Sequence, residues 1–164
     1  MRYMTLLFLI LLTPVLSLPT AAAGVGVPHP QLRDTCPVCG MLVARYPAWI
    51  ATVLYEDGHS DHFDGAKDLF KYLFDLPRYA PGRKAEQITA IGVTEYYGLT
   101  RIDARSAWYV IGSGVLGPMG HELVPFAALE DATEFLEDHG GTRMLRFDDV
   151  TSTLLRDLDA GRLH

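Results

Sequence analysis

Apolar and polar positions along the chain define six short segments that predict strands. These segments cover residues 48–55, 59–63, 86–94, 107–111, 122–126 and 143–147. Turn-forming residues lie next to most of them, as is usual for strands. Glu56, Asp57 and Gly58 form a turn signal, so the first two strands are expected to pair as a hairpin. Pro125 has no backbone N–H, which predicts that the fifth strand lies at an edge or end of a sheet.

Three further segments predict helices. In the first, residues 65–74, the apolar side chains recur every three or four positions. Asp64 is expected to cap the start of this helix, and Pro77 to end it. The second helix covers residues 129–138, with an acidic first turn and Gly140-Gly141 as its stop. The third covers residues 150–158.

The same landmarks occur twice along the chain. Ala48-Trp49 opens a strand, Gly58-His59 opens the next, and Phe63 closes it before a helix. Ala107-Trp108, Gly120-His121 and Phe126 repeat this order. We therefore predict a single α+β domain built from two related ββα-type halves, with mostly antiparallel sheet and helices on one face.

The first 23 residues have the pattern of a secretory signal peptide. Arg2 supplies a positive charge, residues 6–12 form a continuous apolar run, and Ala21-Ala22-Ala23 offers a cleavage point before Gly24. The apolar run is too short to cross a bilayer core, which needs about 20 residues. We expect export by a signal peptide at 1–23, a flexible linker at 24–33 and one folded domain at 34–160.

Charge and cysteine usage narrow the kinds of partner. The 164 residues carry 14 basic and 20 acidic side chains, a formal net charge of −6 at pH 7. This balance argues against nucleic acid or an anionic membrane surface as a partner. Both cysteines, Cys36 and Cys39, lie in one CxxC motif. A disulfide between them would close a tiny loop and constrain little chain, so the pair indicates a chemical site.

Three kinds of chemistry could use this cysteine pair. A thiol–disulfide oxidoreductase needs a helix after the motif to lower a thiol pKa, but Gly40, Pro47 and a β-prone run follow it. A zinc site needs further ligands, and His121 and Glu122 are the best candidates. Such a site would hold zinc as an auxiliary ion. A Cu(I) site prefers sulfur ligands, and Met41 lies two residues beyond the second cysteine.

Met119 is the second methionine that indicates a ligand. It lies between Pro118 and Gly120, where a side chain has little to pack against and its sulfur stays free. A thioether binds Cu(I) without losing a proton and cannot be locked into a disulfide. His121 follows two residues later. The favoured prediction is one Cu(I) ion held between the loop 36–41 and the Met119 loop of a carrier that is not an enzyme.

Several motifs together resemble the NosL family of nitrous oxide reductase accessory proteins. They are CPVCGM at 36–41, FDG at 63–65, YY at 96–97, IDA at 102–104, YVIGS at 109–113 and, most distinctively, GPMGHELVPF at 117–126. The resemblance spans about residues 35–150. It implies a fold of two related halves and a periplasmic copper chaperone. Such a protein works beside a membrane ABC-type assembly complex to build the copper centres of the reductase.

By position, the resemblance implies Cys39, Met41 and Met119 as the core copper ligands. Cys36 and His121 would be neighbours or conditional ligands. Many members of the family are lipoproteins with a cysteine at the cleavage site, whereas residues 21–25 contain none. We therefore expect this chain in the periplasm without a lipid anchor, either soluble or held by an uncleaved signal.

Overall fold

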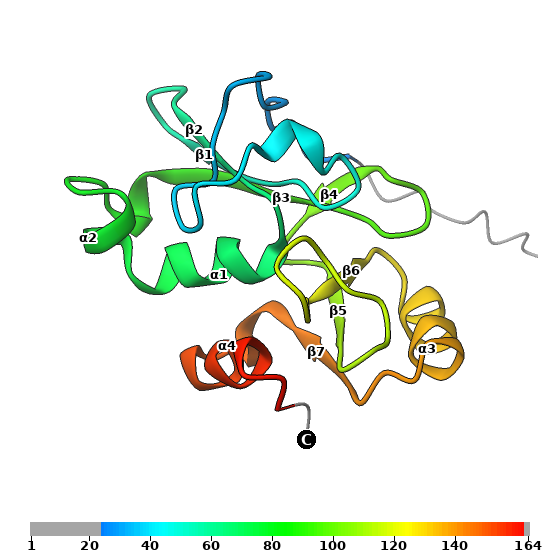
Figure 1. Cartoon of the computed structure of the whole chain (residues 1–164). Helices are drawn as coiled ribbons and strands as arrows, with labels where there is room; N and C mark the ends of the chain where they lie inside the picture. The colour runs from blue at the N-terminus through cyan, green and yellow to red at the C-terminus, as the bar shows by residue number, and fades with distance from the viewer. Residues whose placement is uncertain (1–23, 163–164) are drawn as a thin grey trace, which may run out of the picture.

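The computed structural model describes residues 24–162, and the expected signal peptide at 1–23 lies outside them (Figure 1). The strands are β1 (Ala51–Tyr55), β2 (Ser60–Phe63), β3 (Ile88–Thr94), β4 (Arg101–Asp103), β5 (Trp108–Ile111), β6 (Val124–Phe126) and β7 (Arg143–Arg146). The α-helices are α1 (Ala66–Phe74), α2 (Leu76–Tyr79), α3 (Leu129–Asp138) and α4 (Ser152–Asp159). Short 3-10 helices are η1 (Val43–Arg45), η2 (Ala85–Gln87) and η3 (Phe147–Asp149). Within this range, no helix combines the length and apolarity needed to cross a membrane.

The strands form two antiparallel sheets, ordered β2-β1-β3-β4 and β6-β5-β7. Strand β1 pairs with β2 on one side and, on the other, with β3, which follows α1 and α2. In the same way, β5 pairs with β6 on one side and, on the other, with β7, which follows α3. The repeat predicted from the sequence is therefore present, and each unit is ββαβ. In Figure 1 the first sheet lies above the second, and α1 lies between the first sheet and α4.

The main core joins the two halves. Helix α1 contacts β1, β2 and α4, while α3 covers β5, β6 and β7. The largest buried cluster contains Phe63 and Phe70 from the first half and Tyr109 and Leu145 from the second. A smaller cluster around Phe126 and Phe135 fills the space between the second sheet and α3. The α+β prediction is confirmed, and the shared core makes the two halves one structural unit.

Local turn chemistry explains the elements that agree with the sequence. Gly58 has φ +84°, which suits the tight turn between β1 and β2. Pro125 lies in β6, which is an edge strand. The backbone N–H that proline lacks is therefore not missing from the hydrogen bonds of a central strand. Gly140, with φ +66°, follows the end of α3. Strand β4 was not predicted, because it is only three residues long and both of its ends are charged.

The prediction that Asp64 caps the start of α1 was wrong. Gly65 is the N-cap residue, with no side-chain cap hydrogen bond. The carboxylate of Asp64 instead accepts a hydrogen bond from the Cys39 thiol. Helix α1 ends at Phe74, as predicted, and Pro77 lies beyond that end, in the first turn of α2. Proline is well tolerated there because the N–H it lacks would have no intrahelical partner.

Residues 24–33 contain no helix or strand and run against the first sheet. The Val25 N–H donates to the Arg101 carbonyl at 3.1 Å. Val27 is buried over Gly92, where a Cβ atom would lie 2.6 Å from a Val27 methyl carbon. The absence of a side chain at Gly92 lets this segment lie close to β3.

Candidate metal site

The CxxC motif lies in a tight loop that leads from the N-terminal segment toward η1. The Cys36 N–H donates to the Met41 carbonyl, and the Gly40 N–H donates to the Cys36 carbonyl, each at 2.8 Å. Gly40 has φ +80°, a conformation that glycine adopts without strain. Only the three-residue η1 follows the loop. The helix N-terminus that would directly follow a redox CxxC is therefore missing from this part of the described chain.

Both thiols lie against carboxylates at the start of α1. The Cys39 Sγ is 3.1 Å from Asp64 Oδ1, and the Cys36 Sγ is 3.4 Å from Asp68 Oδ2. One ligand atom from each of these four residues lies within 4.8 Å of all the others. The site residues missed in the sequence are thus Asp64 and Asp68. The only sequence signal for this pair was their spacing of four residues across a predicted helix start. In a helix this spacing places two side chains on the same face.

Burial raises the thiol pKa values and keeps both sulfurs protonated at neutral pH. Cys36 is almost completely buried, and its pKa lies far above the usual range. Burial, with a contribution from Asp64, raises the pKa of the half-buried Cys39 to about 12. A redox-active cysteine shows the opposite shift. A metal ion that binds here must displace these protons, so its affinity depends on pH.

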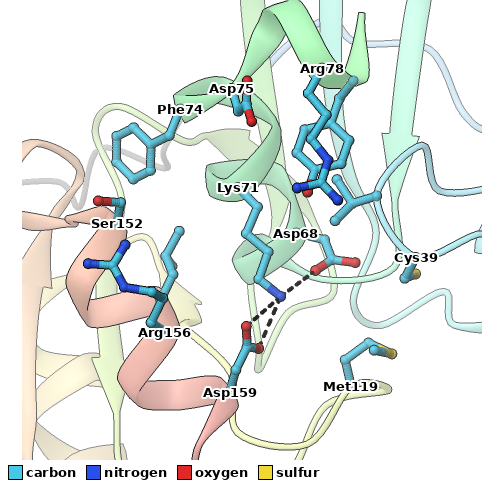
Figure 2. A pocket seen from close by; sticks show the side chains of 13 residues that line it. Cys39, Asp68, Lys71, Phe74, Asp75, Arg78, Met119, Ser152, Arg156 and Asp159 are labelled. Carbon is cyan, nitrogen blue, oxygen red and sulfur yellow. Dashed lines mark hydrogen bonds and ion pairs between the residues drawn. The ribbon is translucent and has the colours of Figure 1, made fainter.

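Met119 approaches the cysteine loop from the other half of the chain. A cavity of about 710 Å³ lies between α1, α4 and the two loops, and Cys39 and Met119 both line it. Figure 2 shows Met119 and Cys39 on the same side of this cavity. Met119 is 42% exposed, so this residue can be reached from solvent. The loop 36–41 and the Met119 loop, which were predicted to converge, therefore both reach this cavity.

The other predicted ligands lie outside that cavity. Cys36 belongs with Cys39 to the thiol–carboxylate group but does not line the cavity. Met41 is half-buried, and its carbonyl closes the cysteine loop. His121 is also half-buried, and its Nδ1 has no hydrogen-bond partner among the described residues. The described geometry therefore groups Cys36 with Cys39 and Cys39 with Met119, and it places neither Met41 nor His121 in either group.

The same architecture has been solved in relatives. A family model described as NosL matches residues 29–155. The chain belongs to the NosL family. A curated relative, the copper-binding lipoprotein NosL of Stutzerimonas stutzeri, is 31% identical over 125 residues. That match covers 76% of this chain and 65% of the relative. The family resemblance predicted from the sequence is confirmed.

Two solved NosL structures also match. The crystal structure of the copper chaperone NosL from Shewanella denitrificans has a TM-score of 0.64 and 28% identity, covering 77% of this chain and 96% of that one. The solution structure of the apo-NosL protein from Achromobacter cycloclastes is 26% identical, with a TM-score of 0.44. It covers 64% of this chain and 87% of that one. The Shewanella structure shows that the fold described above is a NosL fold.

Within this NosL fold, a buried pair of side chains fixes the Met119 loop to α1. The Glu122 carboxyl accepts hydrogen bonds from the Lys67 N–H at 2.5 Å and from the Leu123 N–H at 2.9 Å. Glu122 therefore caps α1 from a distant part of the chain, in the role expected of Asp64. The Lys67 ammonium in turn donates to the Met119 carbonyl at 2.9 Å and pairs with Asp159 at 3.1 Å.

Two glycines make room for the buried side chains of Lys67 and Glu122. A Cβ atom at Gly65 would overlap the Glu122 carboxyl group, and one at Gly117 would lie 3.1 Å from Glu122 Cγ. Lys67 and Glu122 are both almost completely buried. The position of the Met119 backbone is therefore set by buried contacts, while its side chain remains exposed.

Proposed function

We propose that this chain is a periplasmic Cu(I) chaperone that binds copper through Cys39 and Met119. The supporting observation is the cavity that these two residues share, although they lie on loops distant in sequence. Thiolate and thioether sulfurs are soft donors, which Cu(I) prefers over oxygen donors. The NosL relatives named above are described as copper-binding, which supports the same cargo for this chain.

Met41, Cys36 and His121 complete the proposed ligand set. Met41 is two residues from Cys39, and its flexible side chain can turn toward the same ion. Cys36 offers a second thiolate from behind Cys39, within the group of four donors. The unpartnered Nδ1 of His121 supplies a donor near the Met119 loop. Cys39, Met41 and Met119 form the proposed core, and Cys36 and His121 join it conditionally.

An exposed methionine suits a carrier that must release its cargo. An acceptor can approach Met119 from solvent and replace the thioether first, after which the thiolate exchanges. Stepwise ligand exchange requires that the affinity for copper stays below that of the acceptor. The competing function, a thiol–disulfide oxidoreductase, is disfavoured because burial raises the pKa of Cys39 to about 12 and leaves little thiolate for attack.

The proposed destination of the copper is nitrous oxide reductase. This assignment rests on the family resemblance, which also indicates a membrane ABC-type assembly complex as partner. Copper transfer from the loaded chain to a copper-free reductase should then require that complex or be accelerated by it. Equal transfer rates from the chain and from free Cu(I) in buffer would contradict the assignment.

Substitution of Met119 by leucine tests the proposed site with little change in volume. Met119→Leu should lower the affinity for Cu(I) at least about tenfold, equivalent to about 1.4 kcal/mol, because it removes only the sulfur. The measurement is an anaerobic titration against a chromophoric Cu(I) chelator. Met144→Leu, in the second sheet, is the matched control and should bind like the wild type. Equal affinity in both variants would remove Met119 from the site.

A further inference from the structure

We propose that the cavity lined by Cys39 and Met119 is the docking surface for an acidic segment of the protein that exchanges copper with this chain. The inference rests on the proposed copper-carrying function and deepens it, because it states the chemistry of the partner. Ligands that replace the two sulfurs have to approach the space that both residues line. The surface of the partner therefore covers the residues around this cavity.

The cavity can receive side chains from a partner. Its volume of about 710 Å³ lies within the range of about 300–1,000 Å³ that is usual for ligand sites. Phe74, on its rim, is 49% exposed although it is a large aromatic residue. Aromatic and methionine side chains are enriched at protein interfaces, so Phe74 and Met119 together indicate a contact surface. The other apolar residues that line the cavity are Val38, Tyr79 and Leu155.

Two arginines that line the cavity have no acidic partner. Arg78 lies over the Tyr79 ring, with 5.1 Å between its guanidinium carbon and the ring centroid. Arg156 donates a hydrogen bond to the Thr153 hydroxyl at 2.9 Å. Within residues 24–162, neither guanidinium forms an ion pair with a carboxylate. Both arginines are exposed, and a guanidinium has five N–H donors, so both can still bind a carboxylate.

The other charges on the cavity mostly neutralise one another. The Lys71 ammonium pairs with Asp68 at 3.3 Å and with Asp159 at 3.0 Å, as the dashed lines in Figure 2 show. Asp75 is the remaining carboxylate of the lining, and the two unpaired arginines outnumber it. The surface of the cavity is therefore locally positive, in a chain whose formal net charge is −6.

This charge pattern selects an acidic partner and orients it. Arginine and carboxylate groups match each other through two parallel hydrogen bonds, so acidic residues of the partner would pair with Arg78 and Arg156. An apolar or methionine side chain between those acidic residues would enter the cavity toward Met119. A positive patch attracts an acidic segment at this place, while the acidic remainder of the chain repels it. The partner is therefore directed to the copper ligands.

The affinities of two labelled peptides test this charge preference in the copper-free full chain. Each peptide has one methionine between two leucines, flanked by glutamates in the first peptide and by lysines in the second. In fluorescence anisotropy at low ionic strength, the glutamate peptide should bind at least about tenfold more tightly. Added salt should weaken this preference, because it screens exposed charges. Equal affinities, or no measurable binding of either peptide, would overturn the proposal.

A pair of double variants locates the docking surface. Arg78→Gln/Arg156→Gln should lower the affinity for the glutamate peptide at least about fivefold, because it removes both unpaired cations from the cavity. Arg105→Gln/Arg143→Gln removes the same charge from exposed positions outside the cavity and should bind the peptide like the wild type. Equal losses in the two variants, or no loss in the first, would overturn the proposal.

The Cu(I) affinity of both double variants, measured by chelator competition, separates docking from copper binding. It should equal that of the wild type, because none of the four arginines is a proposed copper ligand. Peptide binding is measured without copper, so the docking surface can fail while the copper site stands, and the reverse. A loss of Cu(I) affinity in Arg78→Gln/Arg156→Gln as large as its loss of peptide affinity would overturn the docking role.

Discussion

Replacement of Cys39 by serine is expected to lower the affinity for Cu(I) by more than about 100-fold. Loss of a residue that only supports a metal ligand already costs about 10–100-fold, and Cys39 is proposed as a ligand itself. A serine hydroxyl is a hard donor that stays protonated, so it cannot replace the thiolate. Chelator competition under anaerobic conditions measures the difference directly.

Cys36→Ser is the matched control for this prediction. Cys36 has the same chemistry but lies behind Cys39 and outside the cavity that Met119 lines. Its replacement should cause the smaller loss of Cu(I) affinity. If Cys36→Ser lost more affinity than Cys39→Ser, the copper ion would have to lie deeper, within the thiol–carboxylate group.

The second large effect is a loss of stability as the pH rises through the titration of Glu122. Burial raises the pKa of Glu122 to about 8, an effect that the Leu123 N–H and Lys67 oppose only in part. In the unfolded chain this carboxyl group ionises near 4.5. Between these values the folded state holds a proton that the unfolded state has lost. The contribution of Glu122 is therefore complete below about pH 4.5 and falls by about 1.4 kcal/mol per pH unit up to about pH 8.

Urea denaturation of the wild type and Glu122→Gln between pH 5 and pH 9 measures this slope. Glutamine keeps an oxygen acceptor for the Lys67 and Leu123 N–H groups but does not titrate, so the slope should disappear from the variant. Burial lowers the pKa of His62, so His62 lowers the stability as the pH falls. This effect cancels in the comparison because both proteins contain His62. A pH-independent difference between the two proteins would show that Glu122 keeps its ordinary pKa.

Local sequence patterns predicted most of the fold. The bounds of α3 agree with the structure, because an acidic first turn and a glycine pair mark both of its ends. The duplicated order of landmarks predicted the repeat, and the paired topology of β1 and β5 confirms it. Interactions distant in sequence could not be predicted in this way. The cap of α1 comes from Glu122, and only the folded chain brings that side chain to Lys67.

The site could be predicted only in part, for the same reason. Cys36, Cys39 and Met119 were recognisable because their residue types and loop surroundings indicate soft-metal chemistry. Asp64 was assigned to a helix cap, since a carboxylate before a helix usually has that role. Its contact with Cys39 depends on how the loop 36–41 lies on α1, which no local pattern specifies.

X-ray absorption at the copper edge tests the central claim most directly, because it counts the sulfur atoms bound to the metal. The Cu(I)-loaded wild type should show a sulfur shell that loses one neighbour in Met119→Leu and stays intact in Met144→Leu. An identical sulfur shell in the wild type and Met119→Leu would contradict the convergence of Cys39 and Met119 on one copper ion.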